Sequence, residues 1–118
     1  MNTETLVHEY AKVWSPIDAE TRRALLEKVW TEDCVYQDPS DRVAGRGPFA
    51  AHLATFQAQY PGTRFDCHNV ISHHGWVFFE WKMVTPGEVV AMHGRSCGRL
   101  DADGVRFTEI AGFFEPPA

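Results

Sequence analysis

The sequence predicts an α+β fold, in which three N-terminal helices pack on a strongly curved, mostly antiparallel sheet. Helical patterns fill the first half of the chain and strand patterns separated by turns fill the second half, which is the order of an α+β protein rather than of alternating α/β units. The 118 residues match the usual size of one domain, so we expect a single domain over residues 1–118. A curved sheet on a helical layer leaves one core and one open end.

Two helices come first. Residues 3–14 place apolar side chains at the i, i+3, i+4, i+7 spacing of a helix, and Ser15-Pro16 ends that pattern. Asp18 is a favoured N-cap residue, so a second helix is expected to begin behind it. The apolar stripes of the two helices consist of Leu6, Val7, Tyr10, Val13 and Trp14, and of Leu25, Leu26, Val29 and Trp30.

A short strand and a third helix follow. Residues 34–38 are typical of a strand that ends at Asp38, and residues 39–41 of a turn. Pro48 occupies a position favoured in the first turn of a helix, so the third helix should begin near Gly47 and end before Pro61-Gly62. Its apolar stripe consists of Phe49, His52, Leu53, Phe56 and Tyr60.

The second half of the chain predicts a meander of four strands, over residues 65–73, 76–84, 89–100 and 105–115. Residues 101–104 read Asp-Ala-Asp-Gly, a strong hairpin-turn signal. Pro116 and Pro117 predict a frayed end.

The two faces of strand 76–84 differ. One face is wholly apolar, with Val77, Phe79, Trp81 and Met83. The opposite face carries Trp76 and Phe78 among polar residues, so we expect a homodimer through the outer sheet face. The alternative is that these aromatic side chains are scattered over an exposed surface.

Composition excludes several classes of function. The net charge is −5 and the only basic doublet, Arg22-Arg23, is expected on an exposed helix face, so a nucleic-acid partner is disfavoured. The chain has no apolar run long enough to span a membrane and no signal-peptide pattern, which predicts a cytoplasmic protein. Three widely spaced cysteines indicate reduced thiols, and no Cys/His spacing fits a metal. No phosphate-binding or dinucleotide motif occurs, so we expect no cofactor.

Three short motifs carry a resemblance to a known family. They are Val35-Tyr36-Gln37-Asp38-Pro39, Gly45-Arg46-Gly47 ahead of a helix, and the closing Gly112-Phe113-Phe114. Together with the order of elements, they make the whole chain resemble the nuclear transport factor 2-like superfamily, and within it the SnoaL-like and ketosteroid-isomerase-like small proteins. The resemblance implies a cone-shaped α+β barrel with a pocket inside the cone, and a homodimer. It does not imply one activity, because this fold has many functions.

The isomerase branch of that superfamily implies roles for three residues. Asp38 matches the general base, an aspartate before a proline at the end of the first strand. Tyr10 matches the tyrosine of the first helix that binds the enolate oxygen. Ser96 stands where the branch has a protonated aspartic acid as the second oxyanion donor, which is a departure from the family pattern.

Each of these residues has a simpler interpretation. An apolar pocket disfavours the charged form of Asp38 and makes it a stronger base, but an Asp-Pro pair also forms turns in which the carboxylate binds backbone amides. Tyr10 could donate to an oxyanion or could be an ordinary buried helix tyrosine. Ser96 could donate as well, or could be a small residue between Gly94 and Gly98, glycines that indicate a bend or the close approach of a ligand.

Glu109 is a further candidate. Alternation places it on the face of Phe107 and Phe113, where it would be a second acid near the pocket, whereas a register slip of one residue would expose it. His52 shares its helix stripe with Phe49 and Phe56 and could line the pocket. The expected substrate-binding residues are Trp14, Tyr36, His52, Phe56, Tyr60, Phe79, Trp81, Met83, Met92, Glu109 and Phe113.

The sequence leaves two hypotheses of function. The first is a cofactor-independent enzyme of the isomerase or cyclase type that removes a proton next to a carbonyl of a small hydrophobic ligand, such as a steroid-like, polyketide or terpenoid ketone. Asp38 would be the base, Tyr10 would stabilise the enolate and Ser96 would assist. The second is a non-catalytic protein of the same fold that binds a small molecule or a partner.

Overall fold

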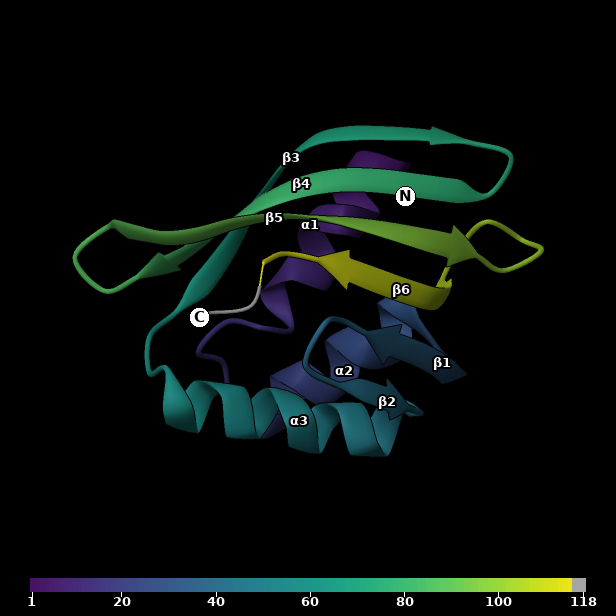
Figure 1. Ribbon diagram of the computed structural model, residues 1–118. Helices are drawn as coiled ribbons and strands as arrows, with labels where there is room; N and C mark the ends of the chain where they lie inside the picture. Colours follow the sequence, from purple (N-terminus) through teal and green to yellow (C-terminus); the bar gives the residue numbers. More distant parts are fainter. Residues whose placement is uncertain (116–118) are drawn as a thin grey trace.

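Three helices and six strands form one α+β unit (Figure 1), which confirms the predicted fold class. The structure is a computed structural model and describes residues 1–115; the predicted frayed end lies outside the described residues. The elements are α1 (Thr3–Lys12), α2 (Ala19–Val29), β1 (Trp30–Gln37), β2 (Arg42–Ala44), α3 (Arg46–Gln59), β3 (Arg64–His73), β4 (Trp76–Thr85), β5 (Val89–Leu100) and β6 (Phe107–Phe113).

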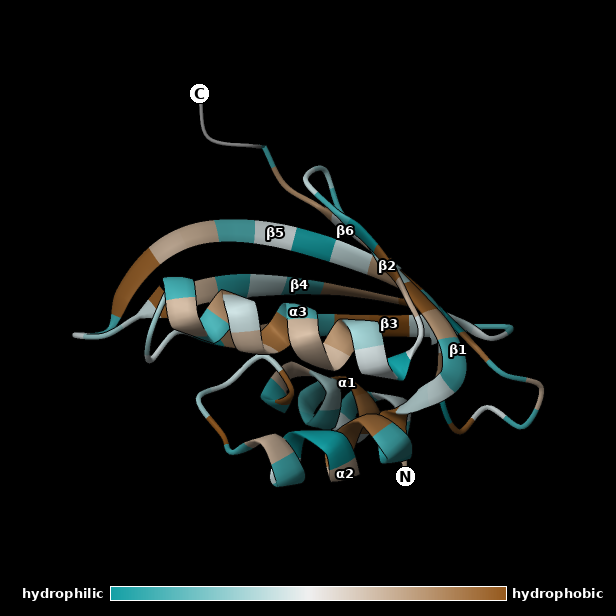
Figure 2. Ribbon diagram, turned by 90° about the horizontal axis from the view of Figure 1, so that it is seen from below, coloured by the Kyte–Doolittle hydropathy of each residue, from teal (hydrophilic) through white to brown (hydrophobic). Residues whose placement is uncertain are grey.

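The strands form one mixed sheet in the order β2-β1-β6-β5-β4-β3. Only β1 and β6 run parallel, and every other neighbouring pair is antiparallel. Figure 2 shows the long strand β5 arching over α3. The sheet therefore bends around the helices, as the order of elements predicted. Within residues 1–115, none of the helices is both long and apolar enough to cross a membrane.

Side-chain caps begin the first two helices. Asn2 accepts a hydrogen bond of 2.8 Å from the amide of Thr5, and Asp18 accepts one of 2.7 Å from the amide of Thr21. Each cap satisfies an amide that has no partner within its helix. The Asp18 cap is the one that the sequence predicted.

Strand β2 was not expected. It has three residues and pairs with the end of β1, with Tyr36 opposite Val43. Between the two strands, the amide of Asp38 donates to the carbonyl of Asp41 at 2.9 Å. The predicted turn after Asp38 is thus the tip of a β-hairpin, which holds Asp38 at the end of a paired strand.

The predicted inner face of β4 is confirmed, since Val77, Phe79, Trp81 and Met83 are all buried. On the opposite face Trp76 is 40% exposed and Phe78 is half-buried. The core therefore lies between the helices and the concave side of the sheet.

Arg22 is a correction to the sequence analysis. Its partner in the basic doublet, Arg23, is exposed, but Arg22 is only 6% exposed. Its guanidinium donates to three carbonyls of the segment between α1 and α2, those of Val13, Ser15 and Ile17, at 3.0–3.1 Å. A charged side chain is buried here because it satisfies carbonyls at a helix end that lack other partners.

Strand β6 contains a second correction. The pairing with β5 shifts between Glu109 and Phe107, so one extra residue lies in β6. Such a bulge reverses the side-chain alternation beyond it. Ile110 and Gly112 consequently face inward, whereas Glu109 and Phe113 are exposed and do not line the pocket. The exposed alternative for Glu109 is therefore correct, and the expectation that Phe113 lines the pocket is wrong.

Candidate functional site

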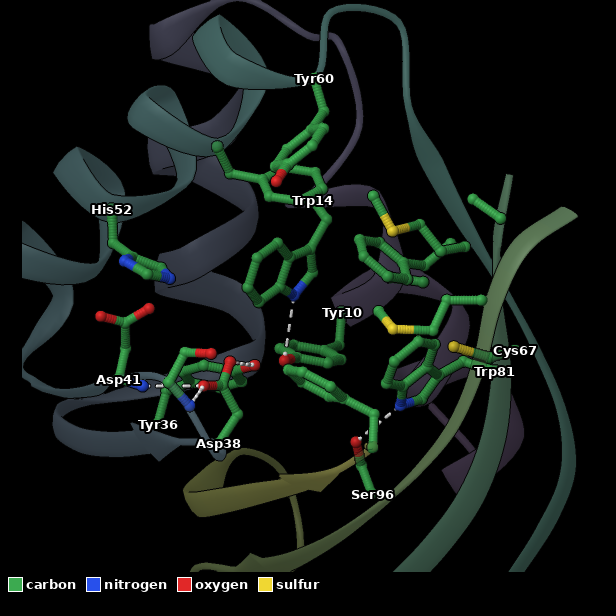
Figure 3. Close-up of a pocket in the computed structure, with 18 of the residues that line it drawn as sticks. Tyr10, Trp14, Tyr36, Asp38, Asp41, His52, Tyr60, Cys67, Trp81 and Ser96 are labelled. Carbon is green, nitrogen blue, oxygen red and sulfur yellow. Dashed lines mark hydrogen bonds between the residues drawn. The ribbon is translucent and has the colours of Figure 1, made fainter. Parts of the chain in front are cut away.

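A cavity of about 560 Å³ lies between the helices and the concave face of the sheet (Figure 3). Its volume falls in the range of small-molecule sites. Most of its lining is aromatic or aliphatic, and its two carboxylates are those of Asp38 and Asp41. The lining residues are Tyr10, Ala11, Trp14, Tyr36, Asp38, Ser40, Asp41, His52, Thr55, Phe56, Gln59, Tyr60, Phe65, Cys67, Phe79, Trp81, Met83, Ala91, Met92, Ser96 and Phe114.

Asp38 is held from two sides. Its Oδ1 accepts hydrogen bonds from the amides of Ser40 at 2.8 Å and Asp41 at 2.9 Å, while its Oδ2 accepts one of 2.6 Å from the hydroxyl of Tyr36. The turn interpretation of Asp38 is therefore correct, and the same carboxylate also lines the cavity. The two interpretations are compatible because the turn uses Oδ1 and leaves Oδ2 on the cavity side with Tyr36.

Tyr10 is 4% exposed, and its hydroxyl accepts a hydrogen bond of 3.0 Å from the indole nitrogen of Trp14. Burial raises the pKa of Tyr10 well above its usual range, with nearby negative charge adding to the effect. The phenol therefore stays protonated at neutral pH. Among the described residues none accepts its proton, so Tyr10 can donate to a ligand in the cavity.

Ser96 lies on β5, opposite Phe79, and is 5% exposed. Its Oγ accepts a hydrogen bond of 3.1 Å from the indole nitrogen of Trp81. The hydroxyl proton of Ser96 has no acceptor among residues 1–115 and is available to the cavity. Both predicted oxyanion donors are thus hydroxyl groups that accept from a tryptophan.

Gly112 on β6 is a close neighbour of Tyr36, Asp38 and Ser96. A Cβ atom at this position would lie 3.5 Å from the Tyr36 hydroxyl, 3.6 Å from Cβ of Asp38 and 3.6 Å from Oγ of Ser96. One methyl-sized point therefore touches the base candidate, its hydrogen-bond donor and one oxyanion donor. The sequence analysis used Gly112 only as part of a motif and did not predict this position.

Aromatic rings form the walls. Trp14 packs edge-on against five rings at centroid distances of 5.2–5.9 Å, those of Tyr36, Phe49, His52, Phe56 and Phe65.

The two glycines that flank Ser96 on β5 leave room for two further rings, those of Trp81 and Phe107. A Cβ at Gly94 would lie 2.1 Å from the Trp81 ring, and one at Gly98 would lie 2.8 Å from the Phe107 ring. The close approach predicted at these glycines is therefore made by the protein's own side chains.

The structure brings the predicted catalytic residues Asp38, Tyr10 and Ser96 to one cavity. All of the predicted substrate-binding residues line it too, except Glu109 and Phe113. Phe114 takes the place expected for Phe113, because the bulge in β6 shifts the inward face by one residue. The sequence analysis missed Asp41, which belongs to the unpredicted hairpin, and Phe65 and Cys67, the inward residues of a strand whose facing was not assigned.

Cys67 on this wall is a half-buried thiol that is largely protonated at neutral pH. Burial, and to a lesser extent the negative charge of Asp66, raises its pKa to about 12. A thiol of this kind is a poor nucleophile at neutral pH, since the thiolate is the reactive form. Within residues 1–115, no three His, Cys, Asp or Glu side chains gather as metal ligands would.

Comparisons with known proteins agree on the fold. One similar structure is that of a proposed isomerase of the SnoaL-like family from Agrobacterium tumefaciens strain C58, with a TM-score of 0.88 and 26% identity over 96% of this chain and 97% of that one. A proposed SnoaL-like polyketide cyclase from Shewanella denitrificans OS-217 matches with a TM-score of 0.71 and 18% identity over 95% and 89% of the two chains.

A third structure is a protein with a ketosteroid isomerase-like fold from Catenulispora acidiphila DSM 44928, in complex with trimethylamine. It has a TM-score of 0.71 and 14% identity over 97% of this chain and 88% of that one. No curated protein matches the chain. The profile of the SnoaL-like domain matches residues 7–110, which is most of the sequence. The chain therefore belongs to the SnoaL-like domain family.

Proposed function

We propose that this protein is a cofactor-independent enzyme that removes a proton from the carbon next to a carbonyl group, with Asp38 as the base. One observation carries the proposal: the Asp38 carboxylate is fixed on the wall of an apolar cavity into which Tyr10 and Ser96 can donate hydroxyl protons. Such chemistry requires a base and a stabilised oxyanion within reach of the same substrate.

The hydrogen bonds of Asp38 leave it able to accept a proton. A carboxylate offers about four acceptor positions. The amides of Ser40 and Asp41 use two on Oδ1, and the Tyr36 hydroxyl uses one on Oδ2. The remaining position belongs to Oδ2, the oxygen that Tyr36 holds at the cavity wall.

The proposed step is the transfer of a proton from the substrate to Asp38, which turns the ketone into an enolate. The proton moves from carbon to Oδ2 of Asp38, the C–H electron pair becomes a C=C bond, and the carbonyl π electrons move to oxygen. Tyr10 and Ser96 would stabilise that oxygen by donating hydrogen bonds. Return of the proton to another carbon would complete an isomerisation, whereas attack of the new carbanion on a second carbonyl would close a ring.

The substrate class follows from the cavity. A volume of about 560 Å³ and walls built by aromatic rings fit a flat hydrophobic ketone of steroid-like, polyketide or terpenoid type. The names of two similar structures, a proposed isomerase and a proposed polyketide cyclase, support both reaction types.

The test is solvent deuterium exchange into a panel of enolisable hydrophobic ketones, followed by mass spectrometry. Wild type should introduce deuterium next to the carbonyl, and Asp38→Asn should not, because an amide cannot accept the proton. Exchange that persists in Asp38→Asn would assign the base to another group.

A second candidate function is ligand binding without catalysis. The observation in its favour is that three of the four acceptor positions of Asp38 are already occupied, as in a purely structural turn. The same experiment separates the two. A binding protein would retain ketones in native mass spectrometry without exchanging their protons, and Asp38→Asn would retain them equally well.

We also propose that two copies of the chain associate through the outer sheet face. That face carries Phe113, 56% exposed, and Trp76, 40% exposed. The same face carries both signs of charge, with Glu80 opposite Arg95 and Arg99 opposite Glu109 on neighbouring strands. In a two-fold dimer, acidic residues of one copy can therefore lie against basic residues of the other. Sedimentation should give a dimer for wild type and a folded monomer for Phe113→Glu; a wild-type monomer at all concentrations would refute the interface.

A further inference from the structure

We propose that Trp81 is a positioning residue for the active site: its indole N–H occupies one lone pair of the Ser96 hydroxyl and thereby directs the Ser96 proton into the cavity, toward the oxygen of the bound ligand. This inference rests on the proposed function and extends it. It assigns the second oxyanion donor to a two-residue unit, Trp81 and Ser96, rather than to an acid.

The contact between the two residues is enclosed. The indole nitrogen of Trp81 lies 3.1 Å from Oγ of Ser96, and the side chains are only 7% and 5% exposed. An indole N–H can only donate, so Ser96 must be the acceptor in this pair. A serine hydroxyl has one proton and two lone pairs, and the proton rotates to suit its partners. With one lone pair used by Trp81, the proton points elsewhere, and the cavity is on the open side of Ser96 (Figure 3).

A glycine on β5 leaves the space that this contact needs. Trp81 is paired with Gly94 on β5, and Phe79 is paired with Ser96, so the indole must lean along the sheet by two residues to reach Ser96. It does so across Gly94, where a Cβ would lie only 2.1 Å from Cζ2 of the ring. No real Cβ contact is that short, so any other residue at position 94 would displace the indole from Ser96.

The same construction occurs on the opposite wall. There the indole nitrogen of Trp14 donates to the Tyr10 hydroxyl at 3.0 Å and leaves the phenol proton for the cavity. Donation to a hydroxyl also makes it a better donor, because hydrogen bonds in a chain polarise one another. Ser96 is intrinsically a weaker donor than a carboxylic acid, and the N–H of Trp81 offsets part of that difference.

The experiment uses 2-naphthol as a probe, a flat aromatic alcohol whose anion resembles an enolate. Its ionised fraction when bound is read from the long-wavelength absorption of the naphtholate, over a pH series. Four proteins form a double-mutant cycle: wild type, Trp81→Phe, Ser96→Ala and the double variant. Trp76→Phe, on the same strand but on the outer face, is the matched control.

Wild type should favour the bound naphtholate. Trp81→Phe should lower the ionisation constant of bound naphthol about fivefold, as expected for the loss of one neutral hydrogen bond. Because Trp81 also lines the cavity, the affinity for naphthalene, which has no oxygen, measures separately what the smaller ring does to packing. In the Ser96→Ala background the Trp81→Phe change should have no further effect. Gly94→Ala should reproduce the Trp81→Phe result if it folds, and naphthalene affinity reports whether the cavity is intact.

Two results would overturn the inference. One is an equal effect of Trp81→Phe with and without Ser96, which would make Trp81 a wall residue only. The other is no preference of wild type for the naphtholate. Neither decides whether Asp38 is a base, because deuterium exchange lost in Asp38→Asn would still support the proposed function.

Discussion

The hydroxyl of Tyr36 donates a hydrogen bond of 2.6 Å to Oδ2 of Asp38. The two residues lie two positions apart at the end of β1, on the same face of the strand. Burial, together with the nearby Tyr10 and Asp38, raises the pKa of Tyr36 far above its usual range, so the phenol remains a donor at neutral pH. Tyr36 lines the cavity, as expected of a substrate-binding residue, and this contact also orients the carboxylate.

We predict that Tyr36→Phe weakens exchange activity through Asp38. Losing this hydrogen bond frees the carboxylate to rotate, so kcat should fall about tenfold with little change in KM, and stability should fall by about 1–2 kcal/mol. Steady-state kinetics and urea denaturation measure the two effects. The control is the Asp38→Asn background, where the stability cost of Tyr36→Phe should be smaller; an equal cost in both would mean that the hydrogen bond contributes little.

Gly112→Ala should block the site without unfolding the protein. The new methyl would touch the Tyr36 hydroxyl, Asp38 and Ser96 at 3.5–3.6 Å, which is ordinary van der Waals contact, and it would occupy the space between them. Ligand affinity, measured by calorimetry, should fall about tenfold or more, because even one excess methylene in a tight pocket costs about 1–3 kcal/mol.

The matched control is Gly47→Ala. A Cβ at Gly47 meets nothing within 4 Å, and the residue lies in α3 away from the cavity lining. This variant should bind ligand normally and gain stability, by up to about 1 kcal/mol. Normal ligand affinity in Gly112→Ala would show that the ligand does not reach the space between Tyr36, Asp38 and Ser96.

Arg22→Leu should be strongly destabilising, whereas Arg23→Leu should not. The Arg22 variant leaves the carbonyls of Val13, Ser15 and Ile17 without their donor, and we expect a loss of about 2–4 kcal/mol. Arg23 makes only exposed ion pairs, with Glu20 and Glu27, each worth under about 1 kcal/mol. Urea denaturation compares the two, and similar losses would refute the structural role of Arg22.

Stability should fall as the pH rises above about 9. Cys67 has an ordinary pKa of 9.0, raised by burial to about 12 in the folded protein. Because the folded-state pKa is the higher one, the full stability is present below pH 9.0 and is lost as the unfolded thiol ionises above it. Burial also raises the pKa of Cys34, Tyr10 and Tyr36, which act in the same direction.

The contribution of one thiol can be isolated. Between pH 8 and 10, wild type should lose about 1 kcal/mol more unfolding free energy than Cys67→Ala, since a thiol ionised only when unfolded contributes about 1.4 kcal/mol per pH unit above its ordinary pKa. Urea denaturation at the two pH values measures this difference. Parallel losses in the two proteins would show that Cys67 ionises equally in both states.

The sequence predicted the helices and long strands well because their signals are local. Asp18 caps α2, and the apolar alternation from Val77 to Met83 assigned the inner face of β4 correctly. Local patterns also placed Asp38 correctly at the end of a strand, where its carboxylate both binds the amides of the following turn and lines the cavity. The cavity itself, and the roles expected for Asp38, Tyr10 and Ser96, came from the family resemblance.

The errors come from features that depend on tertiary pairing. A single-residue bulge in β6 reversed the facing of Glu109 and Phe113, and alternation alone carries no signal for it. Arg22 is buried because the segment between α1 and α2 folds so that the carbonyls of Val13, Ser15 and Ile17 converge on its guanidinium. The partnership of Trp81 with Ser96 requires an indole lying across Gly94, and no pattern in the sequence reveals the direction of that ring.

The account depends most on Asp38 as a base, and the direct measurement is the rate of solvent deuterium exchange into an enolisable hydrophobic ketone by three proteins. They are wild type, Asp38→Asn and the control Asp33→Asn, an exposed aspartate on the same strand that does not line the cavity. The account predicts exchange by wild type and Asp33→Asn, and a loss of at least about a hundredfold in Asp38→Asn, within the range that general bases contribute. Equal exchange by all three proteins, with Asp38→Asn correctly folded, would contradict it.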